Sequence, residues 1–177
     1  MRLRLLSFWD RSEMLKKLLV FATCLATLAW AATKPDFSGD YAAQQKKSDT
    51  AITASLRVVQ TESAVEVTRI HGDKSIMNRF PLDGSESEYT TETGVHGKCR
   101  AQLKNGSLVL ESLVASRPNT NAPSLRFDTI EEWRLSADTK TLTIKTEIKS
   151  PDMSADVMAA AFPNNPQTEK YQRLDGR

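Results

Sequence analysis

The sequence has very few of the residue patterns that enzymes and metal proteins use. It contains no Gly-rich phosphate loop, no nucleophile elbow, no His-Glu-x-x-His and no paired Cys-x-x-Cys. The usual signals of phosphoryl transfer, serine hydrolysis, zinc chemistry and dithiol redox chemistry are therefore missing. Histidine occurs only twice among 177 residues, at His71 and His96. We expect no catalytic residue, no metal site and no cofactor, and a protein that is not an enzyme.

Cysteine is equally scarce. Of the two cysteines, Cys24 lies in an N-terminal segment that we expect to be removed, which leaves Cys99 alone. An exported chain of this size without a disulfide must be held together by its hydrophobic core. Cys99 has no base beside it on its own strand either, because His96 is three positions away and residues three apart on a strand point to opposite faces.

Long apolar runs are absent except near the start of the chain. Leu18–Trp30 is an uncharged run of 13 residues behind two lysines, and the small-x-small pattern that a signal peptidase accepts follows at residues 29–31. Such a run is too short to span a bilayer and is typical of a secretory signal peptide. We expect residues 1–31 to be this signal, with Met14 as an alternative start. Residues 32–177 would then form one periplasmic or secreted domain that is not an integral membrane protein.

The mature chain also lacks an excess of charge of one sign. The first 31 residues hold five basic and two acidic side chains, so the remainder carries 19 basic and 20 acidic side chains, a formal net charge of −1. No basic stripe remains that could hold nucleic acid or an anionic membrane. We therefore expect no nucleic-acid partner.

The clearest positive signal is an alternation of apolar and polar residues in the segment 125–148. On its first arm the apolar residues share one parity, and on its second arm they do so again: Leu125, Phe127, Trp133 and Leu135, then Leu142, Ile144 and Ile148. A strand points successive side chains to opposite faces, so this period of two predicts a hairpin with one buried face. Residues 136–140 are polar and form the turn.

A second hairpin has its register fixed by its turn. Asn105-Gly106 is the preferred pair for a type I′ turn, and it predicts that Ala101 faces Leu110 and that Cys99 faces Ser112. The even-numbered residues Leu108, Leu110 and Val114 then point inward, while the odd-numbered Val109, Leu113 and Ala115 point outward. A slip by one residue would bury four charges.

The whole pattern predicts an all-β fold of eight or nine short antiparallel strands in an up-and-down meander. We expect Ser85–Gly94 to be a strand end followed by a loop. A short helix is predicted over Ser154–Phe162, with Ser154 as its N-cap and Val157, Met158 and Phe162 resting on the sheet, before a last strand. We expect the sheet to close into a small barrel, and the alternative is a two-sheet β-sandwich.

Several motifs resemble those of exported bacterial lipocalin-like domains of the calycin type. Gly39-Asp40-Tyr41 near the start and Arg173 near the end resemble the calycin signature, with tyrosine where tryptophan is usual. Phe37–Tyr41, Leu82–Gly84 and Trp133–Asp138 followed by Leu142-Thr143 match the broader pattern. The resemblance implies a lipocalin-like β-barrel over residues 32–177 without a defined activity. It also implies that Gly39, Tyr41 and Arg173 form a structural cap, in which the arginine packs over the aromatic ring.

Two sets of inward residues stand out as candidates for a site. Gly97, Cys99, Ala101 and Ser112 form a patch of small residues, which indicates either close packing or room for a ligand. Glu131 shares the inward parity of Trp133, although an unpaired carboxylate would not stay ionised inside. We expect a β-bulge at Glu131-Glu132 that turns both carboxylates outward. The alternatives are an ion pair with an inward arginine such as Arg69, and a ligand-binding carboxylate.

Our first hypothesis for function is an exported barrel that binds a small, mostly apolar ligand without catalysis. The candidate ligand-binding residues are Gly97, Cys99, Ala101, Ser112, Phe127, Glu131, Trp133 and Met158. The segment Met153–Phe162 would act as a lid over the barrel mouth. The alternative is an extracytoplasmic interaction or structural domain with a filled core, whose working surface is the outer apolar face of the second hairpin or this segment. The sequence does not identify the protein partner of such a domain.

Overall fold

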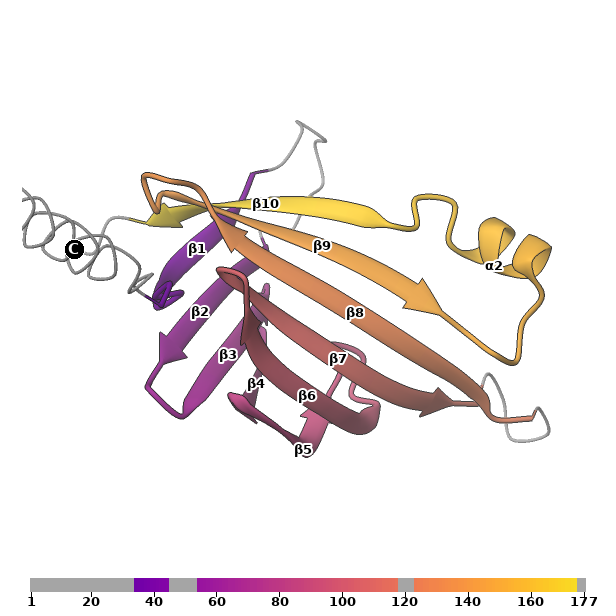
Figure 1. Ribbon diagram of the computed structural model, residues 1–177. Coiled ribbons are helices and arrows are strands. Elements are labelled where there is room, and N and C mark those ends of the chain that lie inside the picture. The colour runs from indigo at the N-terminus through magenta and orange to yellow at the C-terminus, as the bar shows by residue number, and fades with distance from the viewer. Residues whose placement is uncertain (1–33, 45–53, 118–122, 175–177) are drawn as a thin grey trace, which may run out of the picture. The chain divides into compact units, whose positions relative to one another are not determined.

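The fold is known from a computed structural model that describes residues 34–44, 54–117 and 123–174. Within these ranges the chain forms one antiparallel sheet of ten strands and one short helix before the last strand (Figure 1). The strands are β1 (Gly39–Ala43), β2 (Ala54–Gln60), β3 (Ala64–His71), β4 (Lys74–Pro81), β5 (Asp83–Thr90), β6 (His96–Lys104), β7 (Ser107–Ser116), β8 (Leu125–Leu135), β9 (Thr141–Lys149) and β10 (Gln167–Leu174). The predicted signal peptide lies outside the described residues.

The sheet closes almost completely on itself. Its order is β4-β3-β2-β1-β10-β9-β8-β7-β6-β5, so neighbours in sequence are neighbours in the sheet except for β4 and β5, and β1 pairs with β10. The two edge strands, β4 and β5, are joined by side chains instead of a ladder. The Asn78 amide donates to the Thr90 carbonyl (2.9 Å) and accepts from the Thr90 N–H (2.9 Å), and the rings of Phe80 and Tyr89 lie 6.1 Å apart. The all-β barrel is confirmed, and the two-sheet sandwich is wrong.

The turn at Asn105-Gly106 sets the register that the sequence predicts. Both residues have positive φ, 51° and 79°, and β6 pairs with β7 so that Ala101 faces Leu110 and Cys99 faces Ser112. The inward residues Leu108, Leu110 and Val114 are buried, whereas Leu113 and Ala115 are exposed. The alternation on β7 therefore reports the inner and outer faces of the wall, as expected.

The strand β5 is longer than the sequence suggests. We expected a strand end and a loop over Ser85–Gly94, but the strand runs to Thr90 and brings the number of strands to ten. Its inward residues Ser87 and Tyr89 are half-buried and pair with Cys99 and Gly97 of β6. Because these inward residues are polar, the strand has no apolar alternation by which it could be recognised.

The helix α2 (Ala155–Ala161) lies between β9 and β10, beyond the end of β9 in Figure 1. Ser154 is its N-cap, and the Ser154 hydroxyl accepts a hydrogen bond from the Val157 N–H (3.4 Å). No residue of the helix is buried, and Val157 is 51% exposed, so the prediction that Val157 rests on the sheet is wrong. Phe162, just after the helix, does pack edge-on against Phe127 of β8, with 6.0 Å between ring centres.

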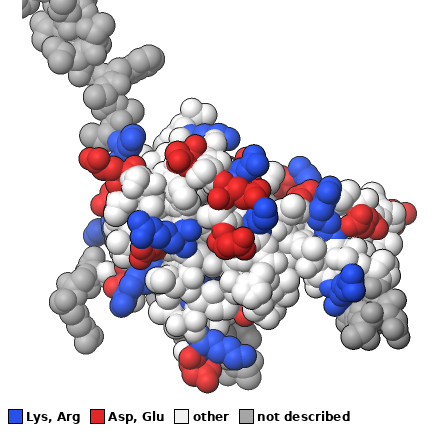
Figure 2. Space-filling view, turned by 90° about the horizontal axis from the view of Figure 1, so that it is seen from below, with Lys and Arg blue, Asp and Glu red and all other residues white. Residues whose placement is uncertain are grey.

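The outer surface of the barrel is mixed in charge. On the face shown in Figure 2, acidic and basic side chains are interspersed and no large area carries a single sign. On the exposed surface, Arg57 pairs with Asp40 (2.7 Å) and Lys149 pairs with Glu147 (2.9 Å). Among the described residues, no helix has the length and apolar character needed to cross a membrane.

Candidate binding site at the open end of the barrel

The most unusual feature inside the barrel is an ion pair between Arg69 of β3 and Glu131 of β8. Arg69 Nη2 donates to Glu131 Oε2 (2.6 Å), and each side chain is only 14% exposed. The same carboxylate oxygen accepts a hydrogen bond from Trp133 Nε1 (2.8 Å). The Arg69 guanidinium carbon also lies 5.7 Å from the centre of the Trp133 ring, within the range of a cation–π contact.

The position of Glu131 corrects one expectation. We expected a β-bulge at Glu131-Glu132, but the pairing of β8 with β7 and with β9 continues through both residues without a shift. Glu131 therefore points inward, and the ion pair with Arg69, which was one alternative, is what the structure contains. An inward carboxylate is tolerated here because a guanidinium and an indole N–H satisfy it.

Electrostatics keep the Arg69 guanidinium charged. Burial, the largest single influence on Arg69, lowers its pKa, but the acidic groups around it, Glu131 first and then Tyr89 and Glu92, outweigh burial, so the pKa is raised above its ordinary value. Arg69 Nη1 lies 3.8 Å from Glu92 Oε1, in the turn between β5 and β6. The guanidinium thus remains positively charged and is already committed to two carboxylates.

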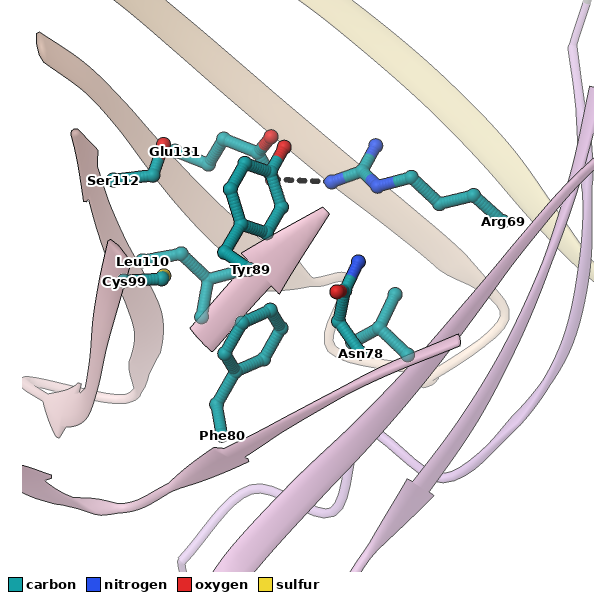
Figure 3. Close-up of a pocket in the computed structure, with 9 residues that line it drawn as sticks. Arg69, Asn78, Phe80, Tyr89, Cys99, Leu110, Ser112 and Glu131 are labelled. Atoms are coloured by element: carbon teal, nitrogen blue, oxygen red, sulfur yellow. Dashed lines mark hydrogen bonds and ion pairs between the residues drawn. The ribbon is translucent and has the colours of Figure 1, made fainter. Parts of the chain in front are cut away.

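On the closed side of this pair, the barrel interior is filled. The cavity drawn in Figure 3 has a volume of only about 10 Å³, counted as the space open to the centre of a water molecule. That is room for about one water molecule. Beyond the cavity the interior is occupied by fully buried side chains, of which the largest are Trp133, Tyr41, Phe37, Phe80, Leu108, Leu142 and Ile144.

The small-residue patch belongs to this filled part. Cys99 is 2% exposed and Ala101 is fully buried, and Ser112 lines the small cavity with Cys99. Gly97 has a different reason to be small, because a Cβ there would collide with the Leu113 carbonyl of β7. Burial and, after it, the charge of Glu131 raise the pKa of the Cys99 thiol to about 12. The thiol is therefore neutral at ordinary pH and behaves as a small apolar group.

On the open side of the pair lies a larger pocket, which we call the mouth pocket. Its volume is about 300 Å³. It is lined by Arg69, His71, Tyr89, Thr91, Glu92, Thr93, Glu131, Thr146, Gln167, Glu169 and Tyr171. Two polar contacts lie within this lining: His71 Nε2 is 3.4 Å from Glu92 Oε1, and the Tyr171 hydroxyl donates to Glu169 Oε2 of the same strand (2.8 Å). Burial raises the pKa of Tyr89 to about 12, with Glu131 adding to the effect, so this phenol is neutral as well.

A second, more apolar pocket adjoins the mouth pocket; we call it the α2 pocket. It has a volume of about 450 Å³ and is lined by Ile148, Lys149, Ser150, Met153, Ala155, Met158, Ala159, Phe162 and Asn165. Asn165 fastens it to β9, because its amide donates to the Ile148 carbonyl (2.7 Å) and accepts from the Ile148 N–H (2.9 Å). Thr146 of the mouth pocket and Ile148 of the α2 pocket are successive residues on one face of β9. The two pockets therefore lie side by side along that strand.

The eight candidate ligand-binding residues do not share one cavity. Gly97, Cys99, Ala101, Ser112 and Trp133 surround the filled interior, Glu131 forms the floor of the mouth pocket, and Phe127 and Met158 lie at the α2 segment. Sequence reasoning missed Tyr89, Glu92 and Glu169. The parity of Glu169 with Tyr171 would have placed it inward if the last strand had been extended by four residues.

The proposed cap lies at the other end of the barrel. The Arg173 guanidinium carbon is 5.6 Å from the centre of the Tyr41 ring, and Arg173 Nη2 donates to the Ser38 carbonyl. The Tyr41 hydroxyl donates to the Phe37 carbonyl (2.9 Å). Gly39 has a φ of 151°, and a Cβ there would lie 2.7 Å from Arg173 Nε. These contacts close one end of the barrel, and the described residues leave the end with the mouth pocket open.

Two kinds of comparison give no relatives. No family model and no curated sequence matches this chain.

Among the described residues, no group of three or more His, Cys, Asp or Glu side chains is placed to hold a metal ion.

Solved structures, in contrast, show the fold. The chain is similar to the REP1-NXSQ fatty acid transporter, with a TM-score of 0.54 and 12% identity over 80% of this chain and 98% of that one. It is also similar to fatty-acid-binding protein 1 of Echinococcus granulosus (0.52, 11%, 78% and 98%) and to zebrafish ileal bile acid-binding protein in complex with cholic acid (0.53, 13%, 78% and 98%). The likeness shows the fold alone: like these structures, this chain forms a nearly closed antiparallel β-barrel.

Proposed function

We propose that the protein binds a small, mostly apolar molecule without changing it chemically, and that it does so at the open end of the barrel. The observation that carries the proposal is the pair of adjoining pockets, about 300 and 450 Å³, beside an interior with only about 10 Å³ to spare. Support also comes from the likeness in fold to proteins named for fatty acids and bile acids. The leader predicted over residues 1–31 would make it a periplasmic or secreted carrier.

The two pockets suit the two ends of an amphipathic molecule. Its polar head would lie in the mouth pocket, where Glu131, Glu92 and the two tyrosines offer hydrogen-bonding groups. Its apolar part would run past Thr146 to Ile148, Met158 and Phe162 in the α2 pocket. Methionine adapts to ligands of different shape because its side chain is unbranched and polarizable. The helix α2 has no buried residue, so it can move over a bound ligand without breaking a core.

A dye that fluoresces in apolar surroundings tests this proposal. The purified protein should take up the dye saturably, and Met158→Asp should weaken uptake because it places a charge in the α2 pocket. Val157→Asp is the matched control, since the neighbouring Val157 does not line that pocket and is 51% exposed. No saturable uptake, or equal loss in both variants, would reject ligand binding at the open end.

The filled interior also favours a second candidate, an extracytoplasmic interaction domain. Its working surface would include Leu113 on the outer face of β7 and Val157 on α2, which are 40% and 51% exposed. A stoichiometric protein partner whose capture is lost in Leu113→Asp or Val157→Asp, together with no dye uptake, would establish this function in place of the first.

A further inference from the structure

The mouth pocket has an unbalanced set of charges. Its titratable lining consists of one arginine, one histidine, three glutamates and two tyrosines. One guanidinium, that of Arg69, faces the three side chains of Glu92, Glu131 and Glu169. The positive charge is not free, because Arg69 is bonded to Glu131 at 2.6 Å and lies 3.8 Å from Glu92.

Two aromatic rings complete the lining. Tyr171 is 4% exposed, and its hydroxyl is held by Glu169 (2.8 Å). Tyr89 reaches into the same space from β5, next to Glu131 and the Arg69 guanidinium (Figure 3). Tyrosine rings beside carboxylates attract ammonium groups, because the negative face of the ring and the carboxylate charge both favour a cation.

We propose that the mouth pocket selects a cationic head group, a primary or quaternary ammonium on an apolar chain, over a carboxylate. This inference rests on the proposed function, the binding of an amphipathic molecule at the open end. An ammonium group would be attracted by the carboxylates of Glu92 and Glu169, and it would leave the Arg69–Glu131 pair intact. A carboxylate would have to take Arg69 from Glu131, which would leave the largely buried Glu131 charge without a partner.

The charges of the mouth pocket therefore favour a different head group from the one that the likeness in fold suggests. The solved structures of this fold are named for fatty acids and cholic acid, which carry carboxylates. In this chain the pocket's arginine already has its carboxylate, supplied by the protein itself at Glu131.

Three ligands with the same chain length and different head groups test the charge preference separately from the proposed function. Decylammonium, decanol and decanoate are titrated into the purified protein by calorimetry, below the concentration at which each aggregates, at low and at high salt. Decylammonium should bind roughly tenfold more tightly than decanoate at low salt, with decanol between them, and the difference should shrink in high salt. Decanoate binding as tightly as decylammonium, or more tightly, would overturn the charge preference and leave the proposed function standing. Binding of none of the three would reject the proposed function itself.

Variants assign the preference to the mouth pocket. Glu92→Gln combined with Glu169→Gln should weaken decylammonium binding about tenfold and leave decanol binding unchanged, because two rim charges are lost. Glu88 and Glu147 point to the outer face of the barrel, because the residues next to them in sequence, Tyr89 and Thr146, point inward. Glu88→Gln combined with Glu147→Gln therefore removes the same net charge outside the pocket and should leave both affinities unchanged. Unfolding midpoints of both doubles show whether the fold is kept. An equal loss in both doubles, or no loss in the first, would overturn the assignment.

Discussion

The two ends of the barrel are built by the same strands and differ completely in character. On β8, Trp133 is fully buried among apolar residues, and two residues further along the same face Glu131 begins the polar end. The same change takes place on β3 between Val67 and Arg69. On β10, Glu169 lies two residues before Tyr171, so charged residues from three strands line the mouth pocket.

This difference between the two ends shows that the sequence of a strand determines two separate things. Alternation decides which side chains point inward, but the composition along the inward row decides where the core ends. The apolar end supplies stability through the burial of apolar area. The polar end does not, because the cost of removing two charges from water offsets their attraction, and a buried ion pair is weak evidence of stability. We infer that the polar end is kept for recognition.

The largest effect is expected in the apolar end. Trp133→Ala should lower the free energy of unfolding by about 4 kcal/mol, because it opens a large cavity beside Leu108 and Ile144 and removes the N–H that donates to Glu131. Urea unfolding measures this. Trp133→Phe keeps an aromatic ring and should cost clearly less. A loss below about 1 kcal/mol for Trp133→Ala would show that this end is not the core.

A somewhat smaller effect is expected at the boundary between the two ends. Glu131→Ala should cost about 3 kcal/mol, because Arg69 would keep its charge in a largely buried position without its closest partner. Arg69→Leu combined with Glu131→Leu should recover much of that loss, because neither charge remains buried. Strictly additive losses in the cycle formed by Arg69→Leu, Glu131→Leu and the double variant would contradict the coupling of the pair.

A third effect is expected at the seam between β4 and β5. Asn78→Ala should cost about 2 kcal/mol, because both hydrogen bonds to the Thr90 backbone are lost in a buried position. Amide hydrogen exchange at Thr90 should become faster as well. Met77→Ala on the same strand is the control, because Met77 is 64% exposed and the change should stay within about 0.5 kcal/mol. Equal effects of the two variants would mean that the seam is not held by Asn78.

The smallest effect concerns alkaline pH. Burial raises the pKa of Cys99 from its ordinary value of 9.0 to about 12. The unfolded thiol therefore loses its proton first, so the stability that the neutral thiol contributes is present below pH 9 and is lost as the pH rises toward 12. Cys99→Ala should make the fall in stability over that range shallower. Rapid reaction of the native protein with Ellman's reagent near pH 8 would contradict a buried, neutral thiol.

Local features of this fold could be predicted from the sequence, and long-range ones could not. Asn105-Gly106 fixed the register of β6 and β7, and Ser154 marked the start of α2, because turns and caps depend on neighbouring residues. The partner of Glu131 is 62 positions away. The pattern could name Arg69 as one alternative, but only barrel closure brings the two side chains together.

Whether side chains fill the barrel interior could not be predicted from the sequence either. Small residues at Cys99 and Ala101 fit an open cavity and a packed core alike, and the outcome depends on how far Phe80, Leu110 and Tyr89 reach across the barrel. The length of strand β5 was underestimated for a related reason, since its inward positions are Ser87 and Tyr89 and give no apolar alternation. Inward polar residues weaken the alternation that reveals a strand, so the polar end of this barrel was the harder part to predict.

The most direct test of the account is to map a bound neutral probe by nuclear magnetic resonance. Decanol carries no charge, so the result does not depend on the charge preference of the mouth pocket. We predict shifts in the amide signals of Tyr89, Thr146, Ile148 and Glu169 on titration, with those of Tyr41, Leu56 and Leu142 unchanged. Saturable shifts at Tyr41, Leu56 and Leu142, without shifts at the open end, would contradict the division of this barrel into a filled end and a binding end.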